Sequence, residues 1–507
     1  MCVSLIYTWG QYCFPAGLIM KHCQCTNAEP MYSVIKNQRH QKMILLIAAF
    51  AIFMDGLDSS IVNVALPVIA GDFGVDISGS SWIVMAYLLI MAGFILAFGK
   101  IADQGRIRQI FSIGFALFAL GSFICAISPT LSCMIAARAL QGLGASMIAA
   151  AAPLLVTRFL PEGMRGLGMG VIATTGGVAL TFGPPIGGLI TAYLGWHWIF
   201  LINVPIGIAA IVLGRSAIPA PHVPVKLEKF DFFGTFILFF AIAGFIMALE
   251  RGPEFGWTSP EILFFVGVFA VCSAVFCFHS LRSRDPLLNI RIFRYWKFSA
   301  VTVSYLLTCM VFAGVMYMVP FYMHTALGLD SAVSGLLLMI SSVITALIGI
   351  PVGAWCDRIG CRTPCILAAI CRIAFCTVLL LIVPSYGILA LLPALICMGL
   401  AFGISGGPAT TRIVQHAPEG EAGTGTSVMI TSDFLGGVIG VAAYAVVFSL
   451  AVPASVGVAV SDVPASLFVE GFHATAVLGL LCGIVTLILS AVVPNLVTKR
   501  EDLVVSE

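Results

Sequence analysis

Stretches of apolar residues long enough to cross a lipid bilayer occupy almost the whole of this sequence. The hydrocarbon core of a bilayer is about 30 Å thick, so a helix needs about 20 apolar residues to cross it. We find fourteen such runs, at 43–69, 79–100, 108–128, 131–153, 165–191, 197–216, 230–249, 261–281, 298–322, 331–352, 364–384, 387–408, 423–449 and 473–493. The sequence therefore predicts an all-α polytopic membrane protein with fourteen transmembrane helices.

The composition excludes several other classes of protein. Hydrophobic residues make up 60% of the 507 residues and charged residues 9%, which leaves too little polar surface for a particle dissolved in water. A formal net charge of +2 gives no basic surface, so we expect no nucleic-acid partner. Most of the 16 cysteines fall inside apolar runs, where a thiol behaves as a small hydrophobe, and their spacing predicts no metal site and no disulfide framework.

The basic residues show how the chain crosses the membrane. One set of alternate loops, together with both chain ends, holds 22 of the 25 Lys and Arg residues, whereas the opposite set holds only Arg251. The cytoplasmic loops of membrane proteins carry an excess of Lys and Arg. We therefore predict an even number of spans and cytoplasmic termini.

Residues 1–42 precede the first span and are expected to form a cytoplasmic extension. Gln11 and Pro15 interrupt the short apolar stretch near its beginning, and no small-residue cleavage site follows, so a signal peptide is poorly supported. We predict that Met31 is the true start of the chain.

Two acidic residues lie inside the first span. Ionisable residues within a membrane are expensive to bury and mark ion or substrate pathways by default. Asp55 and Asp58 are three residues apart and therefore lie on one face of a helix, where two carboxylates can share a proton because their charges repel. We predict a proton-coupling role for Asp58; Asp55 either shares that role or serves packing alone.

Further charged residues occur in other spans. Arg138 lies in the fourth span and needs an acceptor, so it either tunes a nearby acid or binds an anion. Asp433 in the thirteenth span is a second candidate for coupling or substrate binding. Arg372 in the eleventh span and Glu250 at the outer end of the seventh are expected to be structural or interfacial.

Glycine and proline gather in the fifth span, at Gly183, Pro184, Gly187 and Gly188 among others. Irregular backbone cannot face lipid, so these residues must lie where helices pack or a cavity opens. The physics alone favours a packing kink.

Two short loops repeat one pattern. The first contains Gly99, Asp103, Arg106 and Arg108, and the second contains Asp357, Arg358, Gly360 and Arg362. The repeat predicts a duplicated unit: an N-terminal six-helix bundle at 43–218, a linker with two extra helices at 219–297, a C-terminal six-helix bundle at 298–495 and a cytoplasmic tail at 496–507. Ordinary anchoring by basic residues explains the arginines but not the matched Gly and Asp, which could form a latch that breaks when the halves move.

Together these motifs resemble the major facilitator superfamily, and within it the fourteen-helix drug:proton antiporter branch. The resemblance covers nearly everything after residue 43, and it rests on four segments: Leu57–Pro67, Arg138–Gly144, Gly183–Gly188 and Trp196–Pro205. The chain departs from the pattern where Gly105 stands one place early, where Ala179 replaces a glycine, and where Asp433 stands in place of the usual Arg or Gln.

The resemblance implies a proton-coupled secondary transporter that exports lipophilic, cationic drugs or toxic compounds by alternating access. It implies roles in coupling for Asp58 and Arg138, and it implies the proton gradient as energy source without a cofactor. The resemblance also implies a location in a cell membrane, either an inner or a plasma membrane. Expected partners are the small-molecule substrate, protons, the lipid bilayer and, in a Gram-negative cell, a periplasmic adaptor; we expect a monomer and no enzymatic activity. A hydrophobic substrate site could use Trp82, Tyr87, Phe312, Met316, Tyr317, Met318, Phe321 and Tyr322.

Alternatives to this interpretation remain open. One is a dedicated exporter of an endogenous metabolite, such as a siderophore or an amino acid derivative, and another is a proton-coupled importer. A channel or a membrane enzyme is less well supported, because neither charged pore rings nor a catalytic cluster can be recognised.

Overall fold

The computed structural model describes residues 35, 37–220, 231–283, 286–418 and 421–495, which form helices joined by turns without any β-strand in these ranges. The start predicted at Met31, the cytoplasmic extension before residue 35 and the tail at 496–507 lie outside the described residues.

The first predicted bundle consists of six spans. They are α1 (Gln38–Phe73), α2 (Ile77–Ile101), α3 (Ile107–Ala126), α4 (Leu131–Phe159), α5 (Glu162–Tyr193) and the pair α6 (His197–Leu201) and α7 (Asn203–Ala217). The turn η1 (Ala102–Arg106) joins α2 to α3. Each of these helices overlaps a span predicted from the sequence.

The insert and the second predicted bundle supply eight further helices. The insert is α8 (Phe232–Phe255) and α9 (Pro260–Arg282). The bundle is α10 (Trp296–Phe321), α11 (Ser331–Ile359), α12 (Arg362–Leu381), α13 (Leu391–His416), α14 (Ala422–Ala451) and α15 (Ala465–Val492). Short helical turns lie between them: η2 (Ile290–Arg294), η3 (Tyr322–Ala326), η4 (Pro384–Tyr386), η5 (Ile388–Ala390), η6 (Pro453–Ser455) and η7 (Val460–Asp462).

Thirteen helical stretches of the described residues are long and apolar enough to cross a membrane, and one of them contains two predicted spans. That stretch runs over Ile77–Ala126 and has 50 residues. At about 1.5 Å per residue it would be far too long for one crossing. Gly105 interrupts it with a φ of 103°, a conformation that suits glycine, so α2 and α3 are two crossings joined by a turn.

Some boundaries predicted from apolar runs are wrong. The last span was predicted to begin at residue 473, but α15 already begins at Ala465, because Glu470 belongs to the helix and breaks only the apolar run. Similarly, α13 continues to His416, beyond the predicted end at 408. A helix extends past the hydrocarbon core into the polar interface, where apolarity no longer marks it.

Polar side chains at the helix starts fix several helix boundaries. Asp76 accepts a hydrogen bond from the amide of Gly79 at 2.7 Å, and Asp330 accepts one from Val333 at 2.7 Å. Such caps satisfy amides that have no partner within the helix. The caps place the starts of α2 and α11 at matching positions, as expected for the second helix of two related bundles.

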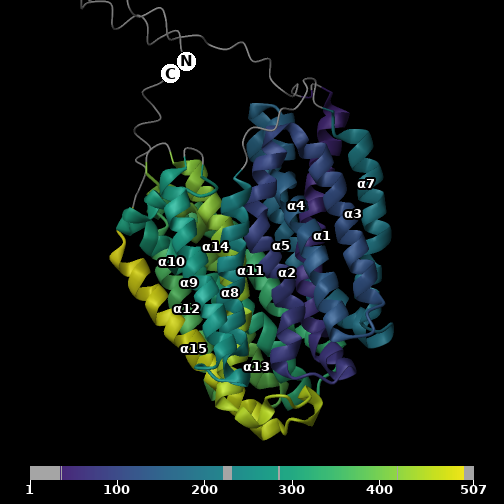
Figure 1. The fold of residues 1–507 in the computed structure, drawn as a ribbon, viewed down its shortest axis with the longest axis vertical. Coiled ribbons are helices and arrows are strands. Elements are labelled where there is room, and N and C mark those ends of the chain that lie inside the picture. The colour runs from purple at the N-terminus through teal and green to yellow at the C-terminus, as the bar shows by residue number, and fades with distance from the viewer. Residues whose placement is uncertain (1–34, 36, 221–230, 284–285, 419–420, 496–507) are drawn as a thin grey trace, which may run out of the picture.

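The two bundles lie side by side, and the beginning of α1 and the end of α15 lie at the same end of the molecule (Figure 1). We call this the terminal end, and the other the opposite end. Contacts between the bundles run along two seams, α2 against α14 and α5 against α11. Helix α8 packs against both α2 and α14, so the insert covers one of the two seams.

The outer surface is apolar, as a lipid-facing surface should be. Helix α9 shows this most clearly: Phe264 is 66% exposed and Val271 62% exposed, while only Ile262, Phe276 and Ser280 are buried. Large apolar faces of this kind are rare in soluble monomers. Together with the family identified below, this arrangement defines a multi-pass membrane protein.

Candidate functional site

A cavity of about 360 Å³ lies between the two bundles. Its walls come from α1, α2, α4 and α5 of the first bundle and from α10, α11 and α14 of the second. A second cavity of about 390 Å³ shares Leu180, Phe312, Met316 and Ser342 with it, so the two form adjoining spaces. A site built from both bundles is suited to alternating access, because movement of the bundles changes the site directly.

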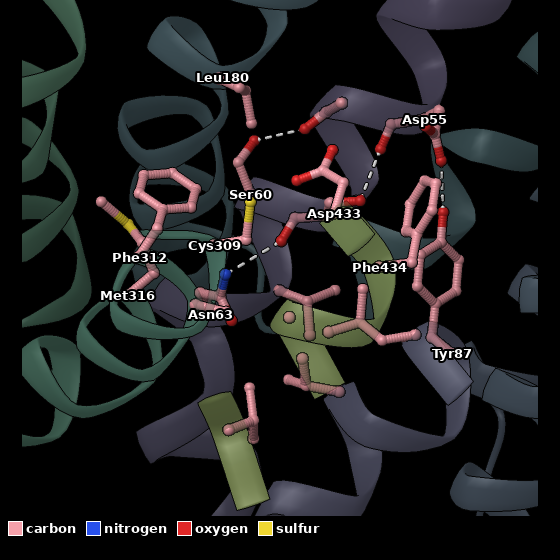
Figure 2. Close-up of a pocket in the computed structure, with 18 of the residues that line it drawn as sticks. Asp55, Ser60, Asn63, Tyr87, Leu180, Cys309, Phe312, Met316, Asp433 and Phe434 are labelled. Atoms are coloured by element: carbon pink, nitrogen blue, oxygen red, sulfur yellow. Dashed lines mark hydrogen bonds between the residues drawn. The ribbon is translucent and has the colours of Figure 1, made fainter. Parts of the chain in front are cut away.

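Two of the predicted acids line this cavity, one from each bundle. Asp55 of α1 is half-buried and accepts a hydrogen bond of 2.6 Å from the hydroxyl of Tyr87 on α2. Asp433 of α14 is exposed to the cavity. Figure 2 shows both carboxylates together with Asn63 and Tyr87 around the same space. The pair places a carboxyl group on each side of a mainly apolar cavity.

The rest of the cavity wall is mainly apolar. Phe312 and Met316 of α10 face it together with Leu180 and Phe434 (Figure 2). Of the eight aromatic and methionine residues predicted for a substrate site, Tyr87, Phe312 and Met316 line the cavity. Trp82 lines a different pocket at the opposite end, and the other four are buried in the core: Tyr317, Met318, Phe321 and Tyr322.

Asp58 is at the centre of a buried polar network beside the cavity. Its carboxylate accepts hydrogen bonds of 2.8 Å from Arg138 of α4, from Gln141 of α4 and from Asn203 of α7. Arg138 also donates to the carbonyl of Ile83 at 3.0 Å, and its guanidinium lies 4.3 Å from the centre of the Tyr87 ring. Both charged side chains are almost completely buried, so the network ties three spans together around a neutral ion pair.

The two acids of α1 have different hydrogen-bond partners and different positions relative to the cavity. Both carboxylate oxygens of Asp58 accept hydrogen bonds, and Asp58 does not line the cavity, whereas Arg138 and Asp55 do. The sequence placed Asp55 and Asp58 on one helix face but could not show that they have different partners. Asn203 belongs to the segment Trp196–Pro205 on which the family resemblance rests, but its contact with Asp58 could not be predicted from the sequence.

The glycines of α5 allow close packing on two sides. A side-chain carbon at Gly183 would lie 1.8 Å from the hydroxyl oxygen of Ser60 on α1. One at Gly188 would lie 2.2 Å from the carbonyl oxygen of Ser331 on α11, and one at Gly335 of α11 would lie 2.2 Å from the carbonyl oxygen of Pro184. The predicted Gly and Pro cluster is therefore where α5 contacts α1 and where the two bundles meet at the opposite end.

The two repeated loops make contacts within their own bundles. Asp103 accepts from Arg158 of α4 at 2.5 Å, and Arg108 donates to the carbonyl of Arg215 at 2.6 Å. In the second copy Arg362 donates to the carbonyl of Ala491. Gly99 lies within α2, Arg106 in η1, Arg358 at the end of α11 and Gly360 in the turn before α12. The side chain of Asp357 lies outside the described residues.

The remaining charged residues of the spans differ in their surroundings. Arg372 of α12 and Glu250 of α8 are each 1% exposed, so Glu250 is buried rather than interfacial. Cys356 and Cys361, at the turn between α11 and α12, form a disulfide that the cysteine spacing did not predict. Within the described residues no cluster of His, Cys, Asp and Glu could hold a metal ion.

Comparison with known proteins identifies the class that this fold and cavity define. The sequence model of the Major Facilitator Superfamily matches residues 48–441. The chain belongs to this superfamily and is a membrane transporter, as the motifs predicted.

Individual relatives point to the same family. The multidrug resistance protein Stp of Mycobacterium tuberculosis is 28% identical over 405 residues, which cover 80% of this chain and 75% of Stp. The riboflavin transporter RibZ of Clostridioides difficile is 29% identical over 412 residues, covering 80% and 88%. The inward-facing, unoccupied crystal structure of a bacterial homolog of the human lysosomal transporter Spinster has a TM-score of 0.62 at 13% identity, covering 90% and 98%. This last likeness shows the shared fold.

Proposed function

We propose that this protein exports lipophilic, cationic drugs or toxic compounds in exchange for protons. The observation that carries the proposal is the placement of Asp55 and Asp433, from opposite bundles, on one largely apolar cavity. An apolar wall accepts hydrophobic compounds of varied shape, and two carboxylates favour a positive charge. The name of the relative Stp, a multidrug resistance protein, supports a range of drug substrates.

The distribution of charge supports an orientation with the terminal end in the cytoplasm. The bundles meet at the opposite end, where the amide of Val460 donates to the carbonyl of Val75 at 3.1 Å and the amide of Gly457 donates to Asp76 at 3.0 Å. In this orientation the cavity is closed toward the outside. The structure then corresponds to the stage at which a substrate enters from the cytoplasm or the membrane.

Coupling follows from competition for negative charge. A proton on Asp55 removes the charge that attracts a cation, and a bound cation disfavours the proton. Asp58 acts with Asp55 in this proposal: protonation of Asp58 would weaken its bond to Arg138 and free the contacts among α1, α4 and α7. Proton binding on α1 is thereby linked to rearrangement of the first bundle.

No cofactor is part of this mechanism, since the proton gradient supplies the energy, and the proposed unit is a monomer in an inner or plasma membrane. In a Gram-negative cell a periplasmic adaptor would extend the export path.

A dedicated metabolite exporter is the second candidate. The similarity to a protein named as a riboflavin transporter favours it, because a single vitamin is a narrow substrate class. The two carboxylates of the cavity favour cationic compounds instead.

Transport by purified protein in liposomes tests the proposal. A fluorescent lipophilic cation and a panel of neutral and anionic dyes would be compared, with and without a pH gradient, for the native chain, Asp55→Asn and Asp58→Asn. Gradient-driven movement of cations by the native chain, and its loss in both variants, is the expected result. Native protein that moves none of the panel would favour the dedicated exporter, and unchanged coupling in both variants would contradict the role of α1.

A further inference from the structure

A second buried acid lies far from the central cavity, at the opposite end of the molecule. Glu250 of α8 is 1% exposed. Its Oε1 atom accepts hydrogen bonds from the hydroxyls of Ser78 at 2.6 Å and Ser81 at 2.8 Å, both in the first turns of α2. Its Oε2 atom is buried and has no hydrogen-bond partner among the described residues. A buried carboxylate normally needs several donors or a cation, so half of this group is left unsatisfied.

Glu250 lies at the wall of a cavity of about 430 Å³. The cavity is bounded by α2, by the start of α4, by α8, by the last turn of α14 and by the loop that contains Val456 and Gly457. It is separate from the central cavity and shares no lining residue with it. A ligand that reaches Glu250 through this space would arrive from the opposite end.

The charged groups around Glu250 do not neutralise it. Arg251, the next residue, forms an ion pair of 2.6 Å with Glu254 one turn later. Asp76, at the start of α2, is an additional acid at this cavity, and Glu261 lies in the first turn of the adjacent helix α9. From α14 and α10 come only the uncharged Ser449 and Tyr317. The cavity therefore has a surplus of acidic groups over the single arginine that lines it.

The segment of α2 that binds Glu250 also holds the two bundles together. The hydroxyl of Tyr317 on α10 donates to the carbonyl of Ile77 and lies 3.1 Å from the hydroxyl of Ser80. One residue earlier, Asp76 binds the amide of Gly457. The start of α2 is therefore hydrogen-bonded on one side to α8 of the insert. On another side it is hydrogen-bonded to the second bundle.

We propose that Glu250 is a second proton-binding site, which protons reach from the opposite end. Through the contact of Glu250 with α2, the two-helix insert holds the bundles closed at that end; we call the contacts of α2 with the second bundle there the outer gate. A proton removes the charge that would otherwise be buried without a cation, so the closed arrangement binds a proton more tightly than an arrangement in which water reaches Glu250. Acid at this end therefore favours closure, and alkali favours opening. That this end faces the outside rests on the proposed function, but the link between the proton and closure does not.

Hydrogen exchange measured by mass spectrometry tests the proposal in detergent, where both ends of the protein meet the same solution. The readout is deuterium uptake in peptides covering the start of α2 and residues 452–464, without substrate, with labelling times scaled to the intrinsic exchange rate at each pH. In the native protein uptake should rise as the pH increases, because the deprotonated site opens. In Glu250→Gln, whose side chain is neutral at every pH, uptake should stay low and independent of pH.

Three further variants make the result specific. Glu254→Gln removes an exposed acid four residues away and should keep the native pH dependence. Asp76→Asn should also keep it, although its uptake is expected to rise at all pH values because the bond to Gly457 weakens. Ser81→Ala retains the acid and should raise uptake even at acid pH by removing one tie to α2.

The proposal would be overturned by native pH dependence in Glu250→Gln, or by loss of that dependence in Asp76→Asn alone. If Glu250→Gln does not fold, the test is made with Ser81→Ala. Deuterium uptake in this variant equal to that of the native protein would contradict the proposal that Glu250 holds the outer gate closed. Because no drug is present, failure of the export proposal would leave this result unaffected.

Discussion

The two bundles differ in how the charge of a buried arginine is compensated. In the first, Arg138 is paired with Asp58 and hydrogen-bonded to Gln141 and Ile83, so its charge is compensated locally. In the second, Arg372 is equally buried, but its Nε and Nη1 atoms have no hydrogen-bond partner among the described residues. Asp433, the acid of the second bundle that lines the central cavity, is exposed to that cavity.

This difference suggests that the two bundles have different roles in transport. A satisfied polar network rigidifies the helices that it joins, and a change of charge within it is felt by all of them. An acid exposed in an apolar cavity is free to meet ligands of different shape. We therefore expect the first bundle to carry coupling and the second to adjust substrate preference.

The largest effect is expected from Arg138→Gln. It leaves Asp58 as a buried charge without its cation, which costs about 3–5 kcal/mol of stability in known cases. Export should be lost, and the melting temperature in detergent should fall sharply. The double variant Asp58→Asn with Arg138→Gln should regain most of the thermal stability without regaining export. A single variant as stable as the native protein would show that the network does not hold the first bundle together.

Asp55→Asn should have the next largest effect. The acid lies at the cavity and its side chain has one hydrogen bond among the described residues, from Tyr87, so the protein should fold normally. Gradient-driven cation export should fall by about tenfold or more, equivalent to at least ~1.4 kcal/mol. Tyr87→Phe is the matched control: it removes the hydrogen bond but keeps the carboxylate, and export should remain coupled to the gradient. Equal losses in the two variants would point to geometry rather than charge.

Asp433→Asn should change preference more than coupling. Water reaches this carboxylate in the cavity, and an ion pair accessible to water contributes roughly 0.5–1 kcal/mol. Export of cationic dyes should therefore weaken by roughly two- to fivefold while neutral dyes are unaffected, which competition assays with dye pairs would measure. If proton coupling disappeared instead, the second bundle would share the role assigned to the first.

The smallest effect is expected from Arg372→Met. An apolar side chain of similar length avoids burying two unpartnered nitrogens, and such replacements are commonly neutral or stabilising by about 1 kcal/mol or more. The melting temperature should stay the same or rise, and export should persist. Loss of export in a stable protein would reveal a functional positive charge in the second bundle.

Long-range patterns in the sequence predicted more than local detail. The apolar runs predicted each span, because the thickness of the bilayer sets a length that the chain must repeat. The motif glycines correctly marked close packing. Three features could not be predicted: the partner of Asp103, the contact of Asn203 with Asp58 and the burial of Glu250. Each depends on contacts between residues that are far apart in the chain. From the sequence alone, a charged residue near the end of a span, such as Glu250, is expected to lie at the membrane interface. Only the position of the neighbouring helix shows that it is buried.

The most direct test of the central claim is proton release on substrate binding. A lipophilic cation would be added to purified protein in weakly buffered detergent solution, and a pH indicator would count the protons released per cation bound. We predict release by the native protein at a pH where the site is protonated, and binding without that release in Asp55→Asn. A cation that binds the native protein without releasing protons, or releases as many from both Asp55→Asn and Asp58→Asn, would contradict coupling through the acids of α1.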